Sequence, residues 1–462
     1  MKIKVTNLGP LRQAEFSLGD LTIICGDNNT GKTYATYALY GFLRFWKEMY
    51  AIPVENAVVT ELVDRGVVSI PLAKYIDRAT EFIDEACKEY RKQIPKVLAS
   101  VPNLFEHTTF EVELIQDEIQ PWPQFAFSLG TEKTPRILGV RREQDSPTVD
   151  VSLLVQEGAP RIPQPDIISG TGAALREIVF GPALPNAFIA SAERTGAAIF
   201  RRELDFARNR LVEQIGSGAA GLDALHWLNK VYFGYPLPVQ RNVDFMRQLE
   251  DLFKLESFIL LKHPGVLEDF ADIIGGEYKV KGDKLSYVPR GNKRLRLTVT
   301  ESSSCVRALL DIGFYLRHSI RPGDLLMVDE PELSLHPKNQ RRMARLFARL
   351  VNLGIKVFVT THSDYIVKEL NTLIMLNRDD PHIAEIREKK GYKKEELISA
   401  ERVKVYVAGE SLLKLEGKSR RSTVCTLVPA DVDPELGIEA KSFDDTINDM
   451  NRIQQDILFG GE

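Results

Sequence analysis

The chain has 462 residues, enough for about two or three domains of ordinary size. Its hydrophobic content of 44% and charged content of 27% are typical of a globular protein. The formal net charge of −4 excludes a global basic field that would recruit nucleic acid, while a local basic groove remains compatible with it.

The cysteines are widely spaced and form no C-x-x-C motif. This spacing argues against a zinc site or a disulfide framework and favours a reducing compartment. The chain begins with an alternating pattern at Met1–Val5 that predicts a strand, not a signal peptide. Because no apolar run is long enough to cross a bilayer, we expect a cytoplasmic protein with no membrane partner.

A continuous apolar run, Leu21–Cys25, predicts a buried strand, and residues 34–50 predict a helix because they include many apolar residues and no proline. The segment between strand and helix fits G-x-x-x-x-G-K-[ST]. Its residues are Gly26, Asp27, Asn28, Asn29, Thr30, Gly31, Lys32 and Thr33. A glycine turn can match this pattern by chance, but the strand before it and the helix after it favour a phosphate-binding loop.

Such a loop curls at its glycines, so that backbone N–H groups and the start of a helix face one anion. Lys32 would reach the β- and γ-phosphates of ATP, and the Thr33 hydroxyl would hold Mg²⁺. Tyr34, the first residue of the predicted helix, joins the candidate nucleotide-binding residues.

The middle of the chain predicts helices, then strands, then helices again. Residues 51–101 carry apolar residues at helical spacing, and residues 108–156 alternate like half-exposed strands. A link that contains Pro and Gly follows at residues 157–172. Residues 200–273 predict short helices without a lasting heptad pattern, so we expect no long coiled-coil arm.

Within this middle part, residues 187–196 begin as a buried strand and end in a polar turn that contains Glu193 and Arg194. The turn is either a second contribution to an active site or a surface loop with an ordinary ion pair. Both interpretations remain open from the residues alone.

Residues 276–300 predict three short strands, the last at Leu295–Val299. Ser303 and Ser304 follow and open a helix that runs to about Tyr315, since serine before a helical run is an N-cap signal. A helix cap is the simplest role for these serines.

A buried strand over residues 325–330 ends in Asp329 and Glu330. A helix over residues 338–353 and a second buried strand, which ends just before His362, complete a parallel β-α-β unit. Four arginines are expected on the solvated side of that helix, with a nucleic-acid contact as the alternative: Arg341, Arg342, Arg345 and Arg349.

These polar strand ends suit ATP chemistry. Asp329 would orient Mg²⁺, and Glu330 would polarise the water that attacks the γ-phosphorus. Pro331 would stiffen the exit from the strand, and His362 could contact the γ-phosphate from the neighbouring strand. Each residue alone fits an acidic turn or a surface histidine, but their order along the chain predicts a site for ATP hydrolysis.

The last part of the chain shows three patterns. Residues 387–394 predict an irregular basic stretch, and residues 403–407 predict a strand. Residues 443–457 carry apolar side chains at helical spacing.

The segment Asp329–Pro337 resembles the joined Walker B motif and D-loop of the ABC-type ATPases, in the soluble branch with Rad50, RecF and OLD-like proteins. Gly26–Asn28 is similar to the phosphate loop of that branch, and Thr361–Ser363 to its H-loop. Ser303 and Ser304 align with its Ser-Ser-Gly signature motif, in which Cys305 stands here in place of glycine.

This resemblance implies an α/β fold: an ABC-type P-loop NTPase with a mixed sheet core and an α+β insertion between the Walker A and signature motifs. Residues 1–50 and 276–380 would form the ATPase core, with residues 187–204 contributing. Residues 51–275 would be the insertion, for assembly or partner docking, and residues 381–462 would complete the ATPase domain.

The same resemblance implies ATP and Mg²⁺ as ligands, with Ser303 and Ser304 covering the nucleotide of a second copy in a homodimer or larger homo-oligomer. The size and layout are similar to ATPase subunits of bacterial anti-phage systems of the PARIS type, which work with a separate Toprim nuclease. That family suggests a sensor that controls a nuclease toxin, with a phage protein as a possible trigger. DNA repair or maintenance, as in RecF-like or Rad50-like ATPases that bind DNA, is the alternative.

Overall fold

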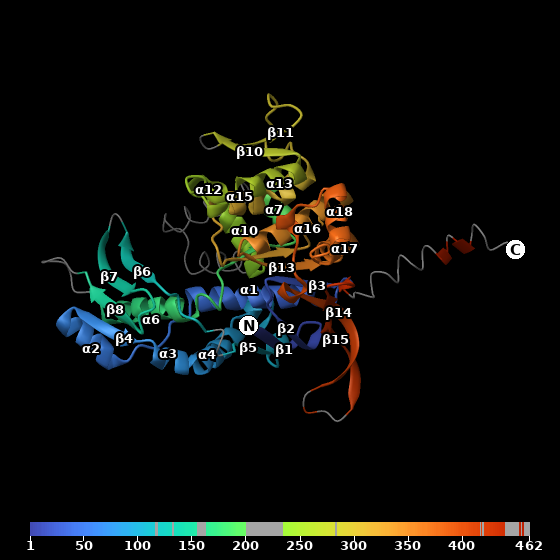
Figure 1. Cartoon of the computed structure of the whole chain (residues 1–462). Helices are drawn as coiled ribbons and strands as arrows, with labels where there is room; N and C mark the ends of the chain where they lie inside the picture. The colour runs from blue at the N-terminus through green and yellow to red at the C-terminus, as the bar shows by residue number, and fades with distance from the viewer. Residues whose placement is uncertain are drawn as a thin grey trace, which may run out of the picture. The chain divides into compact units, whose positions relative to one another are not determined.

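The computed structural model describes residues 1–115, 119–131, 134–154, 163–199, 234–281, 284–415, 417, 420–438, 452–453 and 455–456 (Figure 1). The chain forms two compact units. The first unit consists of Met1–Lys4, Gly41–Gln93 and Phe110–Asn186. The second unit consists of Val5–Tyr40, Ile94–Thr109 and Ala187–Glu462.

A six-stranded sheet with the order β15-β14-β3-β13-β12-β9 forms the centre of the second unit. Its strands are β3 (Leu21–Gly26), β9 (Ala187–Ala190), β12 (Leu325–Asp329), β13 (Lys356–Thr361), β14 (Val403–Lys414) and β15 (Arg421–Ala430). Five of them run parallel, and β15 pairs antiparallel with β14 at one edge. The predicted α/β fold with a mixed sheet is confirmed.

The register of this sheet brings the functional strand ends together. Cys25 on β3 pairs with Thr361 on β13, and Asp329 on β12 pairs with Thr360. Parallel strands end at the same edge of a sheet, which is where α/β proteins bind ligands. The loop after Gly26 therefore lies at the same sheet edge as Asp329.

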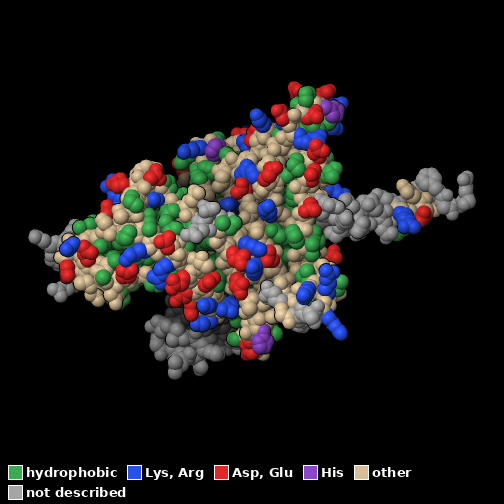
Figure 2. All heavy atoms as spheres, turned by 60° about the horizontal axis from the view of Figure 1, so that its bottom comes forward, with side chains coloured by type: hydrophobic (Ala, Val, Ile, Leu, Met, Phe, Trp, Pro, Cys, Tyr) green, Lys and Arg blue, Asp and Glu red, His purple; other side chains and the backbone are tan. Residues whose placement is uncertain are grey.

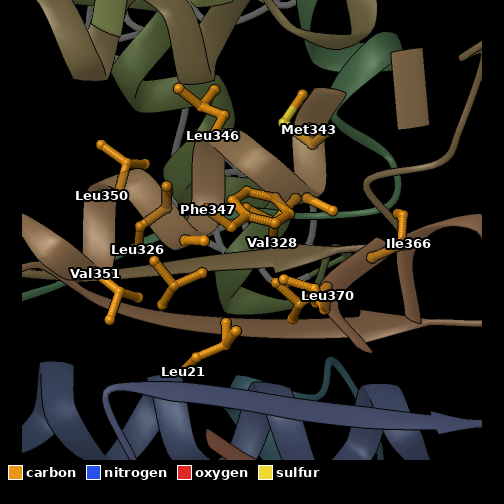
Figure 3. Packing of buried hydrophobic residues seen from close by; sticks show 14 of the residues in the cluster. Leu21, Leu326, Val328, Met343, Leu346, Phe347, Leu350, Val351, Ile366 and Leu370 are labelled. Carbon is orange, nitrogen blue, oxygen red and sulfur yellow. The ribbon is translucent and has the colours of Figure 1, made fainter. Parts of the chain in front are cut away.

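Helices α16 (Pro337–Asn352) and α17 (Asp364–Met375) pack against this sheet. Figure 3 shows α16 side chains above strand residues of the same apolar cluster. The buried residues labelled there are Leu21, Leu326, Val328, Met343, Leu346, Phe347, Leu350, Val351, Ile366 and Leu370. Burial of this face fixes the strands that carry the polar residues at their ends.

Further helices of the second unit are α7 (Arg194–Ile199), α10 (Leu237–Arg247), α11 (Leu249–Leu252), α12 (Phe258–Lys262), α13 (Pro264–Ile274), α14 (Ser304–Ala308), α15 (Leu310–His318) and α18 (Pro381–Lys390). Its short strands are β10 (Gly276–Lys281), β11 (Lys284–Pro289), β16 (Val432–Asp433) and β17 (Gly437–Ile438). Helix α1 (Lys32–Glu48) starts in this unit, and its first two residues are the last two of the phosphate-loop sequence.

Three predictions for this unit are corrected. Leu295–Val299 is not a strand, since Leu297 forms only an isolated bridge with Tyr287. The predicted helix at Ser304 breaks at Leu309, where α14 ends and α15 follows. Residues 387–390, expected to be irregular, complete α18, which ends at Gly391 in the left-handed conformation.

The first unit contains a four-stranded antiparallel sheet with the order β4-β8-β7-β6. Its strands are β4 (Val67–Pro71), β6 (Phe125–Thr131), β7 (Thr134–Arg142) and β8 (Thr148–Leu153), and its helices include α2 (Asn56–Arg65), α3 (Ala73–Asp77), α4 (Ala79–Arg91) and α6 (Gln164–Phe180). The strands predicted between residues 108 and 156 are confirmed.

Two predictions for the first unit are wrong. Strand β4 interrupts the region predicted to be helical, because Val68 and Ile70 alternate with exposed neighbours and pair with β8. Part of the predicted Pro- and Gly-containing link is helix α6. There Gly172 meets the backbone of Ile52, where an added Cβ would lie 2.3 Å from the carbonyl oxygen. Gly172 therefore allows α6 to pack closely against the backbone of Ile52 and does not mark a loop.

The remaining elements of the described residues are β1 (Lys2–Leu8), β2 (Leu11–Ser17), β5 (Thr109–Glu113), α5 (Ile94–Val97) and three 3₁₀ turns at Pro102–Phe105, Lys394–Glu396 and Ala400–Arg402. The helices predicted between residues 200 and 232 and the amphipathic end, apart from Ile453, lie outside the described residues. Among the described residues, no helix has both the length and the apolar character needed to span a bilayer. On the face seen in Figure 2, acidic and basic side chains are interspersed.

Candidate nucleotide-binding site

The loop between β3 and α1 has the backbone that its glycines predict. Gly26 and Gly31 have φ angles of +131° and +92°. A Cβ added to Gly26 would lie 2.2 Å from the carbonyl oxygen of Ala408, and one added to Gly31 would lie 2.7 Å from the Leu11 side chain. Asn29 also has a positive φ, +63°. Only glycine fits both ends of this turn, which supports a compact cradle for an anion.

Lys32 lies in this turn and is only 6% exposed. Its Nζ donates hydrogen bonds to the carbonyl oxygens of Gly26 (2.9 Å) and Asp27 (2.6 Å). Burial lowers the pKa of Lys32, and the carboxylates of Glu330 and Asp329 act in the opposite direction. The ammonium group is therefore held at the loop and faces acids contributed by β12.

A cavity of about 670 Å³ is lined both by the phosphate loop and by the residue that follows β12. Its lining residues are Pro10, Asn28, Asn29, Thr30, Gly31, Lys32, Thr33, Tyr34 and Glu330. The fold thus brings Glu330 next to the phosphate loop, although the two are far apart in the sequence. The volume suits a ligand of the size of a nucleotide.

Asp329 closes β12 and is only 1% exposed. The Thr360 hydroxyl donates to its Oδ1, while its Oδ2 has no hydrogen-bond partner among the described residues. Burial raises the pKa of Asp329 to about 6, and the hydrogen bond from Thr360 opposes this shift. A buried carboxylate oxygen without a partner fits a Mg²⁺ ligand, either directly or through water.

Glu330 has a left-handed backbone, with φ of +52°, which is uncommon for a residue with a side chain. Its N–H donates to the carbonyl oxygen of Thr360 at 3.0 Å. Its side chain is 25% exposed and lines the cavity. The turn therefore buries Asp329 at the sheet edge and directs the next carboxylate toward open space.

His362 follows β13 and depends on an acid that the sequence analysis did not select. Glu332, 7% exposed, accepts hydrogen bonds from the Thr361 hydroxyl (2.9 Å) and the His362 N–H (2.8 Å). The Nδ1 atom of His362 lies 3.1 Å from Glu332 Oε1 and 4.0 Å from Glu330 Oε1. His362 thus lies beside the acidic turn. Only the three-dimensional pairing of β12 with β13 identifies the role of Glu332.

The turn after β9 is not a surface loop with an ordinary ion pair. Arg194 is 2% exposed and donates to backbone carbonyl oxygens, including those of Asp329 (2.7 Å) and Glu330 (2.9 Å). Glu193 is exposed and accepts a hydrogen bond from the Tyr37 hydroxyl at 3.0 Å. This turn therefore contacts both the acidic strand end and the helix that follows the phosphate loop.

Ser303 and Ser304 are exposed and are absent from the residues that line the cavity. Ser303 is the N-cap of α14, and its hydroxyl accepts a hydrogen bond from the Val306 N–H at 3.4 Å. Within one chain, the described structure does not bring these serines to the phosphate loop. Cys305 is half-buried and packs against the apolar core.

The sequence predicted that the arginines of α16 form a solvated row, but these side chains contact acids and a backbone carbonyl of neighbouring helices. Arg341 and Arg345 both bind Glu369, at 2.5 and 2.6 Å, and Glu369 is 2% exposed. Arg349 pairs with Asp269, and Arg342 donates to the carbonyl oxygen of Asp272. These side chains join helices of the core. Within the described ranges, no group of three or more His, Cys, Asp or Glu side chains forms a metal site by itself.

Residues 1–102 and 247–367 match a family model described as an AAA ATPase domain. These two segments of the chain are therefore similar to an AAA ATPase domain. The matched residues include the phosphate loop, Asp329, Glu330 and His362, which the fold places at one sheet edge. No curated protein matches this sequence.

Solved structures similar to this chain include the SMC head domain from Thermotoga maritima. It is 12% identical, with 93% of this chain and 98% of that chain covered and a TM-score of 0.31. An Smc head domain with an extended coiled coil, bound to the C-terminal domain of ScpA derived from Pyrococcus furiosus, is 11% identical over 98% of both chains, with a TM-score of 0.33.

Proposed function

We propose that this protein is an ABC-type ATPase that binds and slowly hydrolyses MgATP in the cavity at the end of β3. The observation that carries the proposal is that Glu330 and the phosphate loop line one cavity. Lys32 and the N–H groups of the loop would bind the phosphates. Tyr34 lines the same cavity, at the start of the helix.

Thr33 and Asp329 would hold Mg²⁺, since the unpartnered Oδ2 of Asp329 and the position of Thr33 in the cavity both fit a hard cation. When bound, Mg²⁺ supplies positive charge that stabilises the phosphates as the bond to the γ-phosphorus breaks. Glu330 would take the proton of the attacking water. His362, held beside Glu330 by Glu332, would contact the γ-phosphate.

The working unit would be a homodimer or a larger homo-oligomer with nucleotide between copies. Ser303 and Ser304 are exposed, lie at the start of α14 and do not reach the cavity of their own chain. The serines of one copy would therefore cover the nucleotide bound by the other. The insertion, residues 51–275, would serve assembly or partner docking, while residues 381–462 would complete the ATPase domain.

At the level of biology, the protein would act as a sensor that controls a separate nuclease toxin in anti-phage defence. The support is the resemblance to PARIS-type ATPase subunits in size and layout. Purification from the native host, followed by mass spectrometry, should recover a Toprim-type nuclease chain. Recovery of DNA repair proteins, together with DNA binding that weakens steeply with salt, would favour DNA maintenance instead.

Calorimetric titration tests the nucleotide site. Wild type should bind MgATP, and Lys32→Ala should not, because the mutation removes the cation held in the loop. Lys404→Ala, at an exposed position on β14, is the control and should bind like wild type. Equal affinity in wild type and Lys32→Ala would contradict the proposed site.

A further inference from the structure

The guanidinium group of Arg194 is buried among backbone carbonyl oxygens. Its Nε donates to the oxygen of Ala308 (2.7 Å), and its Nη1 donates to the oxygens of Ser191 (2.9 Å) and Asp329 (2.7 Å). Its Nη2 donates to the oxygen of Glu330 (2.9 Å). A planar fork with five N–H donors can reach four acceptors at once, which a lysine ammonium on a flexible stem cannot reproduce.

Two of these acceptors flank the Cα atom of Glu330. The carbonyl of Asp329 belongs to the peptide group before it, and the carbonyl of Glu330 belongs to the peptide group after it. Arg194 therefore restrains both peptide planes, and the Glu330 N–H is restrained again by Thr360. The positive φ of Glu330 is a conformation that persists only where the surroundings enforce it.

The other acceptors tie this turn to two further elements. Ala308 is the last residue of α14, the helix that Ser303 caps, and Ser191 follows β9. The turn after β9, which contains Ser191, is fixed to α10. Asn242 on α10 accepts from the Ser191 N–H at 2.9 Å and donates to the Ile189 carbonyl oxygen.

The positive charge of Arg194 lies near acidic side chains to which its guanidinium group donates no hydrogen bond. Burial lowers the pKa of Arg194, and Asp311 and Asp329 act to raise it. The guanidinium thus stays charged, and all its observed hydrogen bonds go to the backbone. Such an arrangement orders a turn and leaves the acidic side chains available for other contacts.

We propose that Arg194 is a positioning residue that holds the left-handed turn of Glu330 and joins that turn to the end of the helix capped by Ser303. This inference rests on the proposed ATPase function. Arg194 itself would touch neither nucleotide nor water. Substitution of Arg194 would lower turnover, because the Glu330 carboxylate would no longer be held in position when the turn relaxes. The backbone of the phosphate loop, which depends on Gly26 and Gly31, would stay unchanged.

The test compares Arg194→Lys and Arg194→Ala with wild type for MgATP affinity, turnover and thermal stability. Turnover should fall by about 10- to 100-fold, the loss typical of residues that orient active-site ligands, with MgATP affinity nearly unchanged. Millimolar methylguanidinium should restore part of the turnover of Arg194→Ala. If that variant does not fold, Arg194→Lys, which keeps the charge and most of the stem, decides alone.

Arg176→Lys is the matched control. Arg176 is also buried and donates to a backbone carbonyl, that of Tyr50, but it belongs to the first unit and lines no part of the cavity. Its substitution should lower stability and leave turnover unchanged. Wild-type turnover in Arg194→Lys would overturn the inference, as would a parallel loss of affinity, turnover and stability without methylguanidinium rescue. An inactive wild type would instead contradict the proposed ATPase function.

Discussion

The carboxylate of Glu332 contacts both the backbone N–H and the imidazole ring of His362. Glu332 Oε1 accepts the His362 N–H at 2.8 Å and lies 3.1 Å from Nδ1 of the same residue. The second oxygen accepts the Thr361 hydroxyl at 2.9 Å. A single buried acid at the start of the loop after β12 therefore fixes the end of β13, so that two neighbouring strand ends keep one geometry.

Glu332→Ala should impair both stability and turnover. The free energy of unfolding should fall by about 1–3 kcal/mol, because a buried hydroxyl and the His362 N–H lose their acceptor. Turnover should fall by about 10- to 100-fold as His362 loses its support. Urea unfolding and steady-state ATPase assays measure these effects, with Glu385→Ala, an exposed acid on α18, as the control.

A double-mutant cycle sharpens this prediction. If Glu332 acts through His362, the loss of turnover in the double variant Glu332→Ala/His362→Ala should be smaller than the two single effects combined. Additive effects would show that the two residues act independently and would remove the support for this role of Glu332.

The stability of the Mg²⁺-free protein should depend on pH through Asp329. Its folded pKa is about 6, above the ordinary value of 3.8, so between these values the folded chain keeps a proton that the unfolded chain releases. Stability should therefore decrease as pH rises from about 4 to about 6, by at most about 3 kcal/mol, and then level off. Asp329→Asn should lack this contribution in unfolding experiments across the range.

The same group should make Mg²⁺-dependent nucleotide binding sensitive to pH. Mg²⁺ must replace the proton on Asp329, so affinity for MgATP should rise from about pH 5 to about pH 7 more than affinity for ATP in EDTA. Calorimetry in both conditions provides the comparison. Parallel pH profiles with and without Mg²⁺ would argue against Asp329 as a metal ligand.

Mixing two inactive variants tests the shared site. Lys32→Ala removes the loop cation, and Ser303→Arg blocks the exposed start of α14. If the serines act on the other copy, a mixed dimer has one site with both defects and one site with neither, so part of the ATPase activity should return. No recovery, although the two variants demonstrably co-assemble, would leave Ser303 as a helix cap only.

Local sequence patterns were sufficient to predict the strand ends of the site. Gly26 and Gly31 require a particular backbone, and the short apolar run before Asp329 favours a buried strand. The order of these segments along the chain, with a helix between two strands, limits the topology to a parallel unit. For that reason the parallel unit and the adjacency of its strand ends could be predicted, whereas the mixed sheet was implied by the family resemblance.

The remaining features depend on contacts between distant segments. Three of the four hydrogen bonds of Arg194 run to residues more than a hundred positions away, and those of Glu332 cross between two strands. The α16 arginines looked solvated because a helical pattern does not show that Glu369 of the next helix faces them. Strand β4 was missed because its alternation is short and lies between helices.

Single-turnover hydrolysis of radiolabelled MgATP, with binding measured in parallel, tests most directly whether Glu330 activates water at the phosphate loop. Glu330→Gln should bind MgATP as wild type does and release phosphate about 100- to 10,000-fold more slowly, since only the proton acceptor is lost. Glu385→Gln should match wild type in both measurements. Phosphate release by Glu330→Gln at the wild-type rate would contradict the assignment of the general base.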